Sequence, residues 1–219
     1  MEPDGVEIRV VACLVEKQRT TPDVYPLSLN ALRLACNQST NRDPVVSYDE
    51  ATVSEALRRL ALRGWTRLAS GAGSRARKYR HLLLDALGVD DEELALLTVL
   101  MLRGAQTPGE LKQRSERLQP FPDLAAVNAT LERLVERGLV VRHPRRPGQK
   151  EDRYEQVLAG EDVMAAVPEA AAAEAPGDNT GDEAAAVPGP GEDRLDRIEA
   201  QIAALRSELA SLREALGED

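Results

Sequence analysis

The sequence predicts an α+β protein that is mostly α-helical and is built from two similar halves. An internal repeat is the first sign, because Leu-Arg-Arg-Leu-Ala-Leu-Arg-Gly-Trp at residues 57–65 returns 74 positions later as Leu-Glu-Arg-Leu-Val-Glu-Arg-Gly-Leu at residues 131–139. Each copy has the spacing of an amphipathic helix that ends at a glycine, and two strand-like segments with a basic turn between them follow it. Two more helical segments precede this unit in both halves. Three helices followed by a β-hairpin is the outline of a winged helix, so we expect two tandem winged-helix domains, at residues 1–88 and 89–160.

The first half shows its elements in that order. Residues 8–18 are broadly apolar and predict a helix, and Ser28 can cap a second one. Residues 47–50 have the spacing of a capping box, which predicts that the third helix begins at Ser47. Gly64 is expected to end that helix in the left-handed conformation. The side chains that this helix should bury are Val53, Ala56, Leu57 and Leu60. Strands of a hairpin are expected at residues 65–69 and 77–83.

The second half repeats these signals. Residues 90–93 can cap a first helix, and Thr107 with Glu110 forms a capping box with proline at the first helical position. Pro122 and Asp123 are expected to open the third helix, which should end at Gly138. The side chains expected to be buried on that helix are Leu124, Val127, Leu131 and Leu134. A hairpin should follow at residues 139–158, around a basic turn at residues 144–148.

Charge is distributed unevenly along the chain. The formal net charge is −9, but residues 1–88 carry 13 basic and 10 acidic groups, whereas residues 161–219 carry 4 and 15. Residues 89–160 are nearly balanced, with 11 and 12. The acidic excess therefore belongs to the C-terminal segment, and the small positive balance of the first half favours a DNA partner for that half.

The C-terminal segment is predicted to contain a linker and a coiled-coil helix. Residues 161–191 are rich in Ala, Pro and acidic residues and should form a disordered linker, because they offer little apolar surface to bury. Residues 192–219 carry apolar residues at alternating spacings of three and four. This pattern predicts a homodimer through that helix, and the alternative is a helix that folds back on its own globular part. The seam consists of Leu195, Ile198, Ile202, Leu205, Leu209, Leu212 and Leu216.

Several classes of protein and site are not expected. No apolar run reaches the roughly 18 to 20 residues that span a membrane, and the N-terminus lacks the pattern of a signal peptide. Cys13 and Cys36 lie in apolar helical contexts that suit reduced thiols, so we expect a soluble, cytoplasmic protein with no membrane partner. No spacing ties His81 or His143 to these cysteines, and we predict neither a metal site nor a cofactor. An enzyme is not expected, because no nucleophile–base pattern is present.

Basic side chains on the first half are the candidates for nucleic-acid binding. A winged helix bound to DNA lays its third helix in the major groove and contacts phosphates with its hairpin. In the first half, the outer face of the third helix should carry Glu55, Arg58, Arg59 and Leu62. In the second half, the same face should carry Ala129, Glu132, Arg133 and Glu136. The predicted nucleic-acid-binding residues are therefore Arg58, Arg59, Arg75, Arg77, Lys78 and Arg80. Two alternatives stay open: these are ordinary solvated charges, or they bind an acidic protein partner.

Three stretches of the first half resemble the YceH family of bacterial proteins. They read Val-Glu-Lys-Gln at residues 15–18, Thr-Pro-Asp-Val-Tyr-Pro-Leu-Ser-Leu-Asn-Ala-Leu at residues 21–32, and Ala-Cys-Asn-Gln-Ser-Thr-Asn-Arg-Asp-Pro-Val at residues 35–45. The resemblance covers about residues 6–160 and implies two winged-helix domains without an established activity. It leaves three hypotheses: a DNA-associated or regulatory protein, a protein-interaction adaptor, or, remotely, an enzyme that uses the loop from Asn37 to Asp43.

Overall fold

A computed structural model describes residues 2–69, 77–145 and 150–159 of the chain. The predicted linker, the heptad helix with its dimer seam, and Arg75 lie outside the described residues. The described ones fold into an α+β structure, about half helical, with two small antiparallel sheets. Within this part of the chain, no helix has the length and apolar character needed to cross a membrane.

The first half runs from α1 to β3. Its elements are α1 (Gly5–Thr20), the short 3-10 helix η1 (Pro22–Val24), β1 (Leu27–Ser28), α2 (Leu29–Cys36), α3 (Glu50–Leu62), β2 (Thr66–Leu68) and β3 (Lys78–His81). After the short helix α4, the second half repeats the order of three helices and a hairpin. Its elements are α4 (Leu83–Leu87), α5 (Asp91–Arg103), α6 (Pro108–Ser115), α7 (Leu124–Glu136), β4 (Val140–His143) and β5 (Arg153–Gln156).

The two sheets also show the repeat that the helices show. In the first half the strand order is β1-β3-β2, and Leu27 lies opposite Tyr79. In the second half β4 pairs with β5, and an isolated bridge joins Gln106 to Tyr154. Gln106 precedes α6 as β1 precedes α2, so the single bridge stands where the first half has a strand. The repeat seen in the sequence therefore extends to the strand pairing.

Most of the predicted helix ends are confirmed. Ser28 caps α2, and the capping boxes of α5 and α6 are formed by Asp90 with Glu93 and by Thr107 with Glu110. The left-handed glycines after α3 and α7 are confirmed as well, with φ of 73° at Gly64 and 66° at Gly138. These ends were predictable because each depends on groups three or four residues apart.

Three expectations are corrected. α3 begins at Glu50 with Asp49 as its N-cap, not at Ser47, because the backbone N–H and C=O of Tyr48 are both bonded to the Asn37 side chain. Leu124 is 39% exposed, since it is the first residue of α7 and lies at the open end of that helix. The strand expected through residue 83 ends at His81, and Leu83, fully buried, starts α4 instead.

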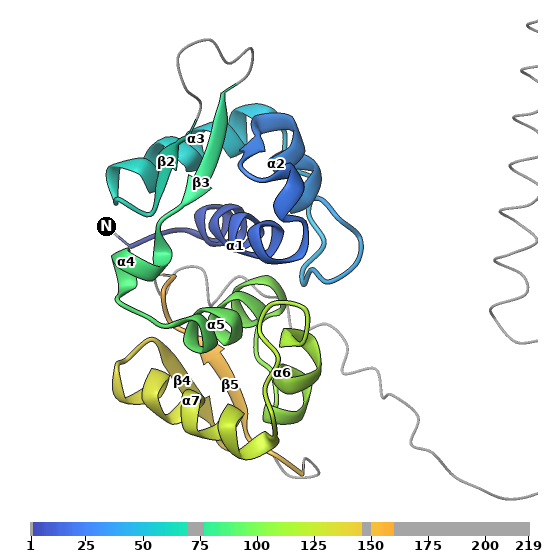
Figure 1. The fold of residues 1–219 in the computed structure, drawn as a ribbon, viewed down its shortest axis with the longest axis vertical. Coiled ribbons are helices and arrows are strands. Elements are labelled where there is room, and N and C mark those ends of the chain that lie inside the picture. The colour runs from blue at the N-terminus through green and yellow to red at the C-terminus, as the bar shows by residue number, and fades with distance from the viewer. Residues whose placement is uncertain (1, 70–76, 146–149, 160–219) are drawn as a thin grey trace, which may run out of the picture. The chain divides into compact units, whose positions relative to one another are not determined.

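One hydrophobic cluster runs through both halves. α1 and α5 bury residues on nearly every side, as helices do when other elements surround them. They pack against each other in the middle of the described part, with the β2–β3 hairpin on one side and the β4–β5 hairpin on the other (Figure 1). Because the described residues share this core within a single compact unit, the proposed division into two domains near residue 88 rests on the repeat alone.

Candidate functional site

A groove lies between α3 and the β2–β3 hairpin of the first half. It has a volume of about 320 Å³ and is lined by α3 from Ser54 to Ala61 on one side and by both strands on the other. Its ionisable side chains, apart from Tyr79, are three arginines and one glutamate. These are Arg58, Arg67, Arg77 and Glu55. The groove therefore has a positive balance, which suits an anionic partner.

Two of the predicted nucleic-acid-binding residues meet in this groove. Arg58 projects from α3 with 62% of its side chain exposed, and its guanidinium pairs with Glu55 on the same helix, with 2.6 Å between Nη2 and Oε1. Arg77 comes from the opposite wall and is exposed. The Arg58–Glu55 pair is solvated on both sides, so its exchange for a phosphate contact would cost the fold little.

Arg67 is a groove residue that was missed in the sequence. It lies on β2 directly opposite Arg80 of β3. Two like charges facing each other across strands destabilise a sheet when nothing lies between them. Within residues 2–69, 77–145 and 150–159, neither arginine has a carboxylate partner. The signal that could have identified Arg67 was its position as the basic residue in the middle of the strand expected at residues 65–69, next to the basic hairpin.

Arg59 makes different contacts from Arg58. It lies outside the groove and pairs with Asp4 at 2.6 Å and with Glu7 at 3.5 Å. Four residues on, Arg63 pairs with Glu7 at 3.1 Å. Asp4 and Glu7 form the capping box of α1, so the two arginines fasten the end of α3 to the start of α1. Of the remaining predicted residues, Lys78 is exposed and Arg80 is half-buried.

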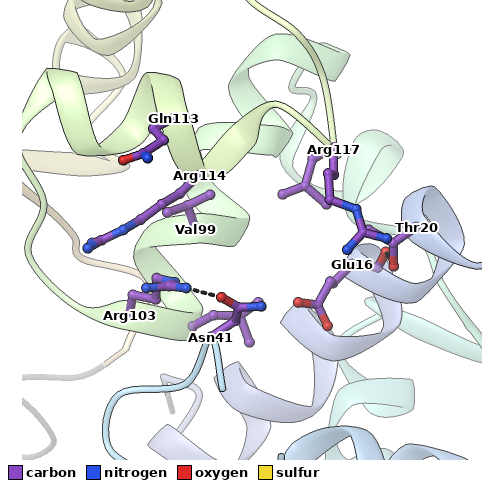
Figure 2. Close-up of a pocket in the computed structure, with 10 residues that line it drawn as sticks. Glu16, Thr20, Asn41, Val99, Arg103, Gln113, Arg114 and Arg117 are labelled. Atoms are coloured by element: carbon purple, nitrogen blue, oxygen red, sulfur yellow. Dashed lines mark hydrogen bonds between the residues drawn. The ribbon is translucent and has the colours of Figure 1, made fainter. Parts of the chain in front are cut away.

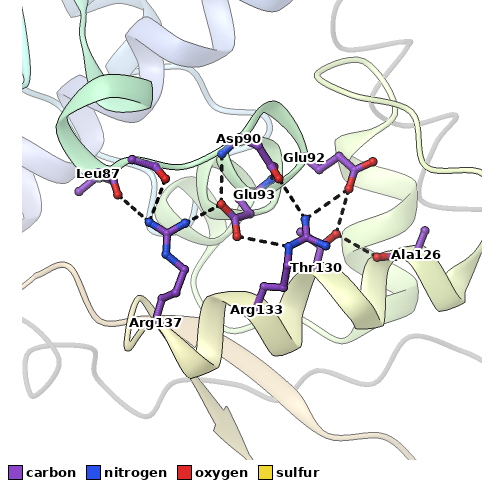
Figure 3. Close-up of polar contacts among 9 residues, drawn as sticks. Leu87, Asp90, Glu92, Glu93, Ala126, Thr130, Arg133 and Arg137 are labelled. Atoms are coloured by element: carbon purple, nitrogen blue, oxygen red, sulfur yellow. Dashed lines mark hydrogen bonds and ion pairs between the residues drawn. The ribbon is translucent and has the colours of Figure 1, made fainter.

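The second half contains an equivalent set of ion pairs, between the end of α7 and the start of α5 (Figure 3). Arg133 pairs with Asp90 at 3.2 Å and with Glu93 at 3.5 Å, and Arg137 binds Glu93 at 2.7 Å. Arg137 also donates to the backbone carbonyls of Leu87 and Gly88. Arg133 in α7 and Arg137 at its C-cap stand 74 positions after their counterparts Arg59 and Arg63. We call each set an arginine clamp: Asp4, Glu7, Arg59 and Arg63 in the first half, and Asp90, Glu93, Arg133 and Arg137 in the second.

The corresponding groove of the second half has a different charge. It lies between α7 and the β4–β5 hairpin, has a volume of about 610 Å³, and contains three basic and three acidic side chains. Arg142 forms an ion pair with Asp152, whose other oxygen accepts from the Arg145 backbone N–H. The charged residues are Glu132, Arg142, Arg145, Lys150, Glu151 and Asp152. Opposite charges thus neutralise each other here, whereas the groove of the first half stays positive.

The loop from Asn37 to Asp43 is held by contacts within the fold. Arg42 is buried and binds both carboxylate oxygens of Glu16, at 3.0 and 2.5 Å, and the Ala35 carbonyl. Although burial alone would raise it, these bonds and the charge of Arg42 hold the pKa of the Glu16 carboxyl below its ordinary value. Over the described residues no group of three His, Cys, Asp or Glu side chains is placed to hold a metal ion.

Comparison with known proteins places the chain in a family. Residues 4–149 match the family model described as protein of unknown function, DUF480. The chain belongs to the DUF480 family. It is 53% identical over 163 residues to a UPF0502 protein of Geotalea daltonii, with 74% of each chain covered. It is 47% identical over 213 residues to a UPF0502 protein of Pelobacter propionicus, covering 96% of this chain and 93% of the relative. The DUF480 match covers both arginine clamps and the groove of the first half.

Proposed function

We propose that this protein binds duplex DNA through the groove between α3 and the β2–β3 hairpin, as a DNA-associated or regulatory protein. The observation that carries the proposal is the meeting of Arg58, Arg67 and Arg77 around a single glutamate. Arg80, opposite Arg67, and the exposed Lys78 extend the positive surface along the same hairpin. Phosphate groups are the partner that would relieve the repulsion among these side chains.

The arrangement suits the way in which a winged helix binds DNA. A single α-helix fits the major groove, and α3 presents an exposed face over its 13 residues. The hairpin beside it would then contact the phosphate backbone. The first arginine clamp assigns Arg59 to the attachment of α3 on α1, so in this proposal Arg59 orients the helix and does not touch DNA.

The heptad segment at residues 192–219 completes the proposal. We propose that it joins two chains, so that two α3 helices address two half-sites of one duplex. Truncation at Gly191 should yield a monomer by sedimentation, whereas the full chain should sediment as a dimer at tens of micromolar. A monomeric full chain at that concentration would remove this part of the proposal and leave the groove untouched.

A protein-interaction adaptor is the second candidate, and exposed apolar residues favour it. Leu62 at the end of α3 is 79% exposed, and Leu68 in the wall of the groove is 51% exposed. Apolar side chains of this size gain more from a protein surface than from phosphates. The enzyme hypothesis is the third candidate, and it rests on Asn41, which brings the loop from Asn37 to Asp43 to the edge of another pocket.

Fluorescence anisotropy with a labelled duplex of about 30 base pairs tests the DNA proposal. The full chain should bind at about 50 mM salt, and the affinity should fall steeply towards 200 mM salt, as phosphate contacts require. The triple variant Arg58→Ala, Arg67→Ala, Arg77→Ala should lose most of the binding and reduce the salt slope by roughly 2 to 3.

The matched control removes three basic residues from the groove of the second half. Arg142→Ala, Arg145→Ala, Lys150→Ala changes the net charge by the same amount, so general electrostatic attraction falls equally in both triples. Binding should stay close to that of the parent in this control. An equal loss in the two triples, or no binding at about 50 mM salt, contradicts the proposal.

A further inference from the structure

A second pocket lies where α1 and the loop from Asn37 to Asp43 meet α5 and the end of α6. Its volume is about 350 Å³, within the size range of small-molecule sites. Val99, Leu102 and Leu118 supply its apolar wall. None of its lining residues belongs to the groove between α3 and the β2–β3 hairpin, so the two sites are separate.

Three guanidinium groups surround this pocket (Figure 2). Arg103 comes from the last turn of α5, Arg114 from α6, and Arg117 from the turn that follows α6. Figure 2 shows Arg103 and Arg114 on one side of the pocket and Arg117 on the other, beside Thr20 and Glu16. Three positive side chains therefore line a single pocket that lies between α1, the loop from Asn37 to Asp43, α5 and the end of α6.

The acidic residues nearby are already engaged. Glu16 lines the pocket, but the buried Arg42 binds both of its oxygens and Lys17 lies 3.3 Å from one of them. Arg114 reaches Glu110 at 3.5 Å, and Glu110 also pairs with Arg153 at 3.2 Å. Each carboxylate is therefore shared between two cations, and the positive charge around the pocket is not balanced.

Three observations show that this positive charge is not neutralised. Partial burial lowers the pKa of the Arg103 guanidinium, and the charges of Arg114 and Arg42 lower it further. Arg103 donates to the side-chain oxygen of Asn41, which is a neutral acceptor. Among the described residues, Arg117 has neither an ion pair nor a hydrogen bond. The pocket thus holds donors that lack an anion.

We propose that this pocket binds a small phosphate monoester with an apolar body. A phosphate monoester carries a charge of about −1.5 to −2 at pH 7, which matches several guanidinium groups better than the single charge of a carboxylate does. Its oxygens can accept paired hydrogen bonds from arginine, and the amide of Gln113 offers a further donor at the rim, whereas the Thr20 hydroxyl already donates to the backbone carbonyl of Glu16. The wall formed by Val99, Leu102 and Leu118 would contact the organic part.

Calorimetric titration of the full chain, without DNA, tests this proposal with three probes. Phenyl phosphate has the dianionic head and an apolar body, inorganic phosphate lacks the body, and benzenesulfonate keeps the body but carries one charge. Phenyl phosphate should bind most tightly of the three. Its affinity should fall between pH 7.5 and pH 5, because its phosphate loses the second charge near pH 6.

Variants identify the pocket as the site of binding. Arg117→Gln should weaken phenyl phosphate binding on the order of ten-fold, the effect expected for one charged hydrogen-bonding partner. Lys112→Gln is the matched control. It also removes one positive charge, but Lys112 lies on α6 and does not line the pocket. Absence of phenyl phosphate binding, equal binding of benzenesulfonate, or equal losses in the two variants would overturn the proposal. None of these outcomes depends on whether the protein binds DNA.

Discussion

Arg133 makes in the second half the contact that Arg59 makes in the first, since Arg133 pairs with the aspartate that caps α5 and Arg59 pairs with the aspartate that caps α1. The distances are 3.2 Å to Asp90 and 2.6 Å to Asp4. Four residues later, Arg137 and Arg63 bind the glutamates of the same two capping boxes. The repeat therefore preserves a set of long-range contacts, and the arginines recur because they attach α3 to α1 in the first half and α7 to α5 in the second.

The first prediction concerns the glutamates of the clamps. Glu93 and Glu7 are nearly buried, and each receives two guanidinium groups and one backbone N–H. Glu93→Ala and Glu7→Ala should each lower the free energy of unfolding by about 2 kcal/mol, because the partly exposed arginines can be rehydrated only in part. Urea denaturation followed by circular dichroism measures both.

Glu55→Ala is the matched control for this prediction. It also removes a glutamate that pairs with an arginine, but the pair is exposed and local. Its unfolding curve should stay close to that of the parent. If Glu55→Ala destabilises the protein as much as Glu93→Ala does, the clamps have no special role in stability.

Local signals could be read from the sequence, whereas long-range contacts could not. Ser28, Asp90 and Thr107 cap their helices through backbone groups three residues away, so their spacing alone identified them. The start of α3 was predicted wrongly because Asn37, eleven residues earlier, engages Tyr48. The same reason hid the candidate pocket, which depends on Asn41 meeting Arg103 across 62 positions. Hydrophobic periodicity carries no information about such pairs.

A second prediction uses the left-handed glycines. Gly64 and Gly138 have positive φ values, and a Cβ at either position would meet nothing within 4 Å. Gly64→Ala and Gly138→Ala should therefore each cost about 1 to 2 kcal/mol from backbone strain alone. Gly109→Ala is the control, because Gly109 lies in α6 and its Cβ would make only ordinary contacts, the nearest at 3.9 Å. Thermal unfolding should show a lower Tm for the first two variants and no decrease for the third.

The third prediction concerns His81 and the acid stability of the first half. Burial, together with the charges of Arg19 and Arg80, lowers the pKa of His81 to about 4. In the fold the imidazole is neutral, since Nδ1 accepts from the Leu83 N–H at 3.3 Å and Nε2 lies 2.5 Å from the Gln18 side-chain oxygen.

The sign of the pH effect follows from the two states of His81. The unfolded chain takes up a proton near pH 6.5, whereas the folded chain resists it until about pH 4. Stability should thus be lost as the pH falls from 6.5 towards 4, by about 2 kcal/mol between pH 7 and pH 5. His81→Asn keeps an acceptor for Leu83 but does not titrate. Its unfolding free energy should depend on pH less steeply than that of the parent, and an unchanged slope would show that His81 is not responsible.

The last prediction tests whether Glu55 limits the DNA affinity of the groove. Glu55 contributes the one negative charge of the groove and holds the guanidinium of Arg58 through two hydrogen bonds. Glu55→Gln removes that charge and leaves Arg58 available to a phosphate. The affinity for a 30-base-pair duplex at about 50 mM salt should rise roughly three- to ten-fold, with a salt slope steeper by about 1. Glu132→Gln makes the same change in charge on the exposed face of α7 and should leave the anisotropy curve of the parent unchanged. If both variants gain equally, the gain comes from net charge and the groove of the first half is not the contact surface.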